Sequence, residues 1–107
     1  DRILITHHKE VVAFSSTGHK GVHIGLRAQE RVVDSLTASR VALVVTNQRA
    51  LGFSSITNQW TVTKIDVGEQ IRDMEAKGFV ASVDTNFRAL GFGGRQGAWK
   101  EYRYRFR

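Results

Sequence analysis

Apolar and polar residues follow one another along this chain in short runs that predict β-strands. Residues 40–46 are almost continuously apolar and rich in valine, which is typical of a strand buried on both faces. Residues 49–54 place large side chains at odd positions and the small Ala50 and Gly52 at even positions, so a neighbouring sheet can approach that face closely. Asn47 lies between the two runs and tolerates the left-handed backbone of a tight hairpin turn.

Two further strands are predicted in the same stretch. Residues 59–65 alternate between polar and apolar side chains, as a half-buried strand does. Residues 69–75 are polar and predict a fourth, outer strand, although glutamate, glutamine, arginine and methionine also favour a helix. The pattern therefore predicts a unit of about 40 residues whose strands run from buried to polar.

This unit is repeated. The motif Thr-Asn-x-Arg-Ala-Leu-Gly-Phe occurs at residues 46–53 and again 39 positions later, and Trp60 and Trp99 are separated by the same offset. Eleven of the twenty residues at 41–60 are identical at that offset. A degenerate copy at the start of the chain aligns Leu4 with Leu43 and Phe14 with Phe53. The sequence predicts a single repeat domain over residues 1–107, with units 1–39, 40–78 and 79–107.

Four strands in each unit of about 40 residues resemble a blade of a β-propeller. No Trp-Asp dipeptide closes the units, so the chain does not resemble WD40 repeats, whereas one tryptophan per unit is similar to lectin-type propellers. Gly21 stands at the tryptophan position of the first unit. We expect an all-β, propeller-like fold. A β-trefoil, which also has three such units, is the alternative. The Leu/Val-Thr-Asn-x-Arg segment at residues 45–49 also resembles one strand pair of bacterial pleckstrin-homology-like domains.

Three units are too few for a closed propeller, which has four or more blades. The outer sheets of an open array would expose edges and faces that favour aggregation. Two chains can pair into a six-bladed ring with two-fold symmetry, or the chain can be part of a longer protein. We therefore expect a homo-oligomer or an obligate subunit of a protein complex.

Composition adds few constraints. The chain has 107 residues, of which 41% are hydrophobic and 24% are charged, as in ordinary globular domains. It contains no run of 18 apolar residues and no visible signal peptide, so we expect a soluble protein of undetermined compartment. The sequence has no cysteine, which excludes disulfides and thiolate metal sites.

Residues with catalytic or metal-binding chemistry do not form a pattern. The four histidines, His7, His8, His19 and His23, lie in the first unit, where aspartates and glutamates do not cluster, and are interpreted as surface residues at loop ends. The chain lacks a Gly-x-Ser-x-Gly nucleophile motif, and its glycine-rich residues 91–97 lack the ending of a phosphate loop. We expect no enzymatic activity, no metal and no cofactor.

Two sets of residues are candidates for ligand binding. Arg49 and Arg88 occupy the same place in the motif, beside Asn47 and Asn86. One interpretation is a repeated polar rim that binds an anionic or sugar ligand, and the other is that each arginine caps its own hairpin by bonding to turn carbonyls. The second set is Trp60 and Trp99, which a lectin would use as stacking platforms.

The last residues of the chain are basic and aromatic in alternation. If Tyr102, Tyr104 and Phe106 pack inward on a half-buried strand, the arginines between them face outward. The net charge of +6 favours an acidic protein or an anionic membrane as partner, and nucleic acid less so, because hidden aromatic rings do not stack on bases. The predicted partner-docking residues are Arg103, Arg105 and Arg107.

The leading functional hypothesis is therefore a non-catalytic, propeller-like interaction module that acts as an accessory or scaffolding subunit. The alternatives are a carbohydrate-binding lectin and a binder of anionic surfaces, either lipid or nucleic acid.

Overall fold

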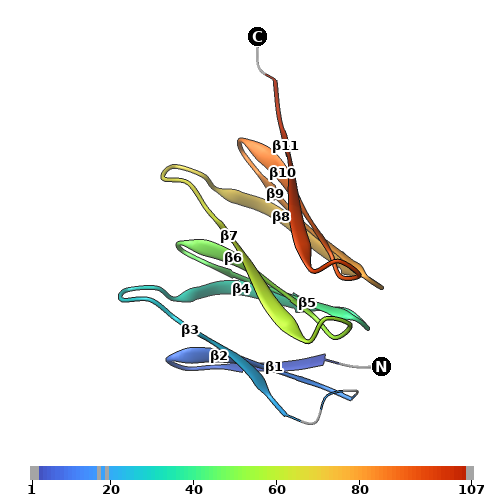
Figure 1. The fold of residues 1–107 in the computed structure, drawn as a ribbon. Coiled ribbons are helices and arrows are strands. Elements are labelled where there is room, and N and C mark those ends of the chain that lie inside the picture. Colours follow the sequence, from blue (N-terminus) through green and yellow to red (C-terminus); the bar gives the residue numbers. More distant parts are fainter. Residues whose placement is uncertain (1–2, 17, 19, 106–107) are drawn as a thin grey trace.

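The computed structural model describes residues 3–16, 18 and 20–105, and every regular element among them is a β-strand (Figure 1). The strands are β1 (Ile3–His7), β2 (Glu10–Ser15), β3 (Val22–Gly25), β4 (Val32–Thr37), β5 (Val41–Thr46), β6 (Arg49–Ser54), β7 (Gln59–Lys64), β8 (Ile71–Lys77), β9 (Val80–Thr85), β10 (Arg88–Gly93) and β11 (Ala98–Arg103). The all-β prediction is confirmed. The described part of the chain contains no helix able to cross a membrane.

The strands form three antiparallel sheets in which neighbours in sequence are neighbours in space. The first sheet contains β1–β3, the middle sheet β4–β7 and the last sheet β8–β11. Figure 1 shows the sheets stacked one above another, with the first sheet at the bottom and the last at the top. We call the contact between the first and middle sheets the first junction, and that between the middle and last sheets the second junction. Closure into a propeller or a trefoil stays a prediction.

The fourth predicted strand of the second unit belongs to a different sheet from the one expected. β8 pairs with β9, for example Met74 with Val83, and therefore opens the last sheet rather than closing the middle one. Its alternative reading as a helix is wrong, because residues 71–77 are extended. Each sheet is thus offset by one strand from the sequence repeat, and the link from β7 to β8 carries the chain from one sheet to the next.

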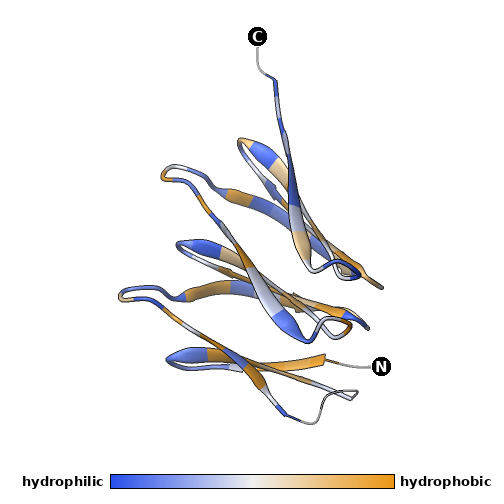
Figure 2. Ribbon diagram, viewed as in Figure 1, coloured by the Kyte–Doolittle hydropathy of each residue, from blue (hydrophilic) through white to orange (hydrophobic). Residues whose placement is uncertain are grey.

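The middle sheet is covered on both faces, which explains the continuous apolar run. Every residue of β5 and β6 is buried. One face packs on the first sheet, where Ala42 and Phe53 contact Ile3 and Ala13. The other face packs on the last sheet through a larger cluster, formed mainly by Val41, Leu43, Val45, Ala50, Ala81, Val83, Leu90 and Phe92. Figure 2 colours the ribbon of the three sheets by hydropathy and shows hydrophobic segments in each of them. Burial of these apolar side chains is the main force that holds the sheets together.

The first hairpin departs by one residue from the repeat. Ile3 pairs with Ser15, whereas in the middle sheet Val41 pairs with Ser54. The predicted alignment of Leu4 with Leu43 is therefore wrong, since Leu4 lies on the outer face and is 68% exposed. Shifting a strand by one residue turns every side chain to the other face of the sheet.

Candidate interaction surfaces

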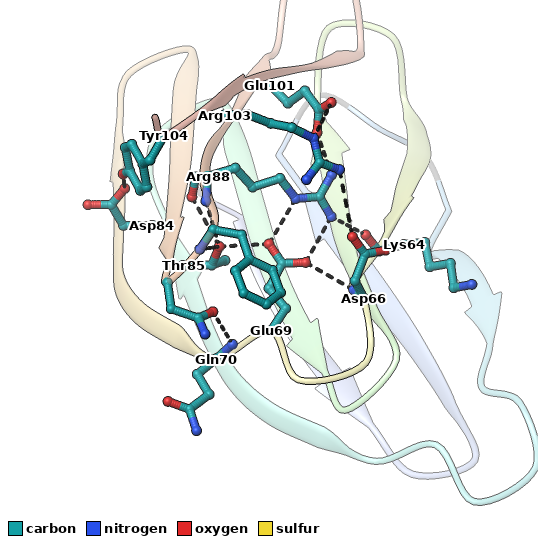
Figure 3. A network of polar contacts seen from close by, with 12 residues as sticks. Lys64, Asp66, Glu69, Gln70, Asp84, Thr85, Arg88, Glu101, Arg103 and Tyr104 are labelled. Atoms are coloured by element: carbon teal, nitrogen blue, oxygen red, sulfur yellow. Dashed lines mark hydrogen bonds and ion pairs between the residues drawn. The ribbon is translucent and has the colours of Figure 1, made fainter. Parts of the chain in front are cut away.

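A buried ion pair fastens each junction, and the two ion pairs occupy equivalent positions in the sequence repeat. In the second junction, Arg88 on β10 donates from Nε to Oε2 of Glu69 (2.8 Å) and from Nη2 to Oε1 (2.9 Å). Glu69 lies in the link between β7 and β8. The same guanidinium also donates to the backbone carbonyl of Lys64, at the end of β7 in the middle sheet (2.7 Å). Figure 3 shows that this one side chain joins a strand of the last sheet, the linking segment and the previous sheet.

The first junction repeats the arrangement with equivalent residues. Arg49 donates from Nε and Nη2 to the two carboxylate oxygens of Glu30 (2.9 and 2.8 Å) and from Nη2 to the carbonyl of Gly25 (3.0 Å). Thr46 donates its hydroxyl to Glu30 (2.6 Å), as Thr85 does to Glu69 in the second junction (2.6 Å). The recurrence shows that the Thr-Asn-x-Arg motif holds consecutive sheets together.

Both glutamates titrate far below their ordinary range. Burial of Glu69 opposes its ionisation, but hydrogen bonds from Arg88, Thr85 and the backbone N–H of Asp66 outweigh that effect, and the pKa falls to about 2. Glu30 has the same balance of burial against hydrogen bonds, and its pKa is also about 2. Hydrogen bonds that the Arg88 guanidinium donates to Glu69, and secondarily to Glu101, raise the pKa of Arg88. Both glutamates are therefore ionised at neutral pH.

The two motif asparagines brace the linking segments. Asn47 accepts a hydrogen bond from the N–H of Arg31 (2.8 Å) and donates to the carbonyl of Gln29 (3.1 Å). Asn86 does the same with Gln70 and Gly68 (2.8 and 3.2 Å). The left-handed residues of this region are Gln29 and Gly68, so the expectation of a left-handed backbone at Asn47 is wrong.

The motif arginines do not cap their own hairpins, because their guanidinium groups reach the preceding sheet. That interpretation is wrong. Arg49 and Arg88 are each only 6% exposed, and each donates from Nε to a glutamate of its own chain. Ligand binding by Asn47, Arg49, Asn86 and Arg88 stays a prediction that their contacts do not support.

The two tryptophans also cross the junctions. Trp60 donates its indole N–H to the carbonyl of Val22 in the first sheet (2.8 Å), and its ring centroid lies 5.3 Å from that of Phe53. Trp99 donates to Thr61 of the middle sheet (2.8 Å) and lies 5.2 Å from Phe92. Both indoles are half-buried. Sugar stacking by Trp60 and Trp99 stays a prediction.

The first sheet exposes the residue types that are buried inside the stack. Alternation along β2 turns Val11 and Ala13 toward the middle sheet and leaves Glu10, Val12 and Phe14 on the outer face. Phe14 is 47% exposed, whereas its repeat equivalents Phe53 and Phe92 are fully buried. We call this outer surface, together with Leu4, the Phe14 face.

The last sheet has a complementary outer surface. Along β10, Leu90 and Phe92 are buried against the middle sheet, and the small residues Ala89, Gly91 and Gly93 lie on the other side. A methyl group built on Gly91 would meet nothing within 4 Å, but at the equivalent Gly52 it would meet the ring of Phe92 at 2.7 Å. We call this outer surface, together with Ser82 and Asp84 of β9, the Gly91 face.

The basic end of the chain is only partly as predicted. Tyr102 is 65% exposed, so the expected inward packing of the aromatic residues is wrong for it. Tyr104 is half-buried and donates its hydroxyl to Asp84, and this bond raises its pKa. Arg103 lies 3.4 Å from Glu101 and 3.7 Å from Asp66, and Arg105 is exposed. Phe106 and Arg107 lie outside the described residues. Docking by Arg103, Arg105 and Arg107 stays a prediction.

A cationic groove lies at the opposite end of the last sheet. It has a volume of about 460 Å³ and is lined by the turns around Phe79 and Gly94, with Lys77 and Arg95 at its rim. The guanidinium of Arg95 lies 4.4 Å from the centre of the Phe79 ring, and that of Arg40 lies 5.6 Å from it. The lining contains no acidic residue. The groove therefore favours an anionic group.

No arrangement for metal binding is found among the described residues. His7, His8 and His23 are exposed, as predicted, and His19 lies outside the described residues. Asp73 and Glu75 are exposed on β8. Comparisons with protein-family models, curated proteins and solved structures found no match for this chain.

Proposed function

We propose that this chain is a non-catalytic assembly module, built like part of a β-propeller, whose outer faces bind further sheets of the same kind. The carrying observation is the exposure of Phe14. The same position is fully buried in both other sheets, where phenylalanine packs against the preceding sheet. Phe14 is thus exposed at a repeat position that is packed against another sheet elsewhere in the fold. Such an exposed apolar residue favours a protein partner.

Several features agree with a scaffolding role. The buried arginines Arg49 and Arg88 bond from one sheet to the preceding sheet and its linking segment. Fixed junctions give the stack rigid ends, and a rigid surface loses little conformational entropy on binding. Trp60 and Trp99 serve the same junctions, so they support this role better than carbohydrate binding.

The test is the mass of the purified chain in solution across about 1–100 µM, a range that covers weak to moderate association. Light scattering should show association that increases with concentration. Phe14→Ser should weaken that association and leave the circular dichroism spectrum unchanged, because the side chain is on the outer face. A wild-type monomer over the whole range, or an association that Phe14→Ser leaves unchanged, contradicts the proposal.

A second candidate function, binding of an acidic protein segment, is favoured by the cationic groove. Lys77 and Arg95 rim an apolar surface that includes Phe79. Binding of fluorescent polyglutamate, measured by anisotropy, should weaken in Arg95→Glu and with added salt. Arg72→Glu, an exposed change of equal charge outside the groove lining, serves as the control. Equal binding by both variants removes this candidate.

A further inference from the structure

The two outer faces of the stack carry the two kinds of residue that meet inside each junction. In the second junction, Phe92 of the last sheet packs over Gly52 of the middle sheet. In the first junction, Phe53 packs with Ala13. Thus a phenylalanine from one sheet meets a small residue of the sheet before it. Among the described residues, no sheet covers the phenylalanine of the Phe14 face, and no sheet covers the small residue of the Gly91 face.

We propose that the Phe14 face of one chain docks on the Gly91 face of a second copy, with Phe14 over Gly91. This inference rests on the proposed assembly function and names its partner and its register. Two such contacts between two chains, related by a two-fold axis, close a ring of six sheets. The contact uses the fold's own packing as its template, so it needs no new arrangement of the backbone.

The charges near the repeat positions of the buried Arg–Glu ion pairs agree with this register. Glu10 stands in the repeat where Arg49 and Arg88 stand, and Arg105 stands where Asp66 does. At the second junction, Arg88 reaches the carbonyl of Lys64 and the glutamate that binds the N–H of Asp66. In the docked pair, Glu10 therefore lies beside Arg103 and Arg105 of the other copy. The signs of the charges are opposite, which favours association.

The Gly91 face is more polar than its buried counterpart. Ser82 and Asp84 replace Leu43 and Val45, which belong to the apolar cluster of the second junction. Less apolar area is available for burial, so the contact between copies is weaker than the internal junctions. Association therefore depends on chain concentration and on the Glu10 ion pairs.

The register is tested with Glu10→Arg and Arg105→Glu, both at exposed positions. Each variant alone should associate at least tenfold more weakly than the wild type, because like charges then meet at both contacts. An equimolar mixture of the two should recover dimers of wild-type affinity, since one contact is wild type and the other has the pair reversed. Arg27→Glu is the control. Residue 27 is the repeat equivalent of Arg105, but it lies at the first junction, inside one chain. The same repeat position at the second junction is already acidic, because it is Asp66.

The outcomes separate the register from the assembly function itself. If Phe14→Ser abolishes association but the mixture of charge variants does not recover it, the chains associate in another register and this inference is wrong. If Phe14→Ser has no effect, the assembly function fails as well. Recovery in the mixture, without recovery in either variant alone and with Arg27→Glu unchanged, supports docking of the Phe14 face on the Gly91 face.

Discussion

The ring of Phe92 lies directly against Gly52 of the preceding sheet, so close that a methyl group on Gly52 would be 2.7 Å from the ring carbons. Neither glycine of this repeat position, Gly52 or Gly91, has a left-handed backbone. The absence of a side chain at Gly52 is therefore required by packing between sheets and not by a turn.

Gly52→Ala should destabilise the fold by about 1–3 kcal/mol, because the new methyl group forces Phe92 or the sheet to move. Gly91→Ala adds the same group at the equivalent place in the last sheet, where nothing lies within 4 Å. Urea unfolding should show no loss of stability for Gly91→Ala, or a gain of up to about 1 kcal/mol. Equal losses for the two variants would contradict the close packing of Phe92.

Glu69→Ala should lower the free energy of unfolding by about 3–5 kcal/mol, because it leaves the buried guanidinium of Arg88 without its main partner. Glu75→Ala, at an exposed position of β8, is the matched control and should change stability by less than about 0.5 kcal/mol. Chemical denaturation of the two variants measures the difference. A loss at Glu69 no greater than that at Glu75 would mean that the ion pair does not fasten the junction.

Acid should destabilise the protein between about pH 4.5 and pH 2. Folding lowers the pKa of Glu30 and of Glu69 from 4.5 to about 2. A lowered pKa contributes stability above the unfolded value, and that contribution is lost as the pH falls through the folded value. Each glutamate should contribute about 3 kcal/mol over this interval. Unfolding measured across it should be less steep in Glu69→Gln, and an equal slope would contradict the assignment.

Trp60→Ala should destabilise the fold by about 3–5 kcal/mol, because the indole packs on Phe53 and bonds to the first sheet. Trp60→Phe keeps an aromatic ring but leaves the carbonyl of Val22 without its donor, which should cost about 1–3 kcal/mol. Thermal unfolding followed by circular dichroism ranks the two. If the protein binds glycans, and Trp60→Ala abolishes that binding without a loss of stability, the lectin hypothesis is favoured instead.

Replacing Arg103 and Arg105 with glutamine should change stability by no more than about 1 kcal/mol in total, because both side chains are exposed and surface ion pairs contribute little. Self-association should weaken in the same variant, and its dependence on salt should flatten. Sedimentation at low and high salt checks both. A large loss of stability with unchanged association would make these arginines structural rather than part of a docking surface.

The sequence alone determined the strands and their repetition. The continuous apolar run at residues 40–46 predicted a strand covered on both faces, and β5 is buried throughout. The small residues Ala50 and Gly52 predicted a close neighbouring sheet, and Phe92 of the last sheet indeed packs directly on Gly52. These inferences succeeded because alternation of side chains is a local property of extended backbone.

Tertiary structure decided which groups meet. The repeat placed Glu30 and Glu69 at one register, but their partners, Arg49 and Arg88, lie 19 residues further along the chain. Only the stacking of sheets brings each pair together, and so a motif that resembled a ligand-binding rim holds one sheet to the next. The exposure of Phe14 likewise depends on the stacking, because no sheet among the described residues covers its side of β2. The alternation of side chains along a strand determines which face of the sheet a residue occupies. The packing of segments distant in sequence determines what covers that face.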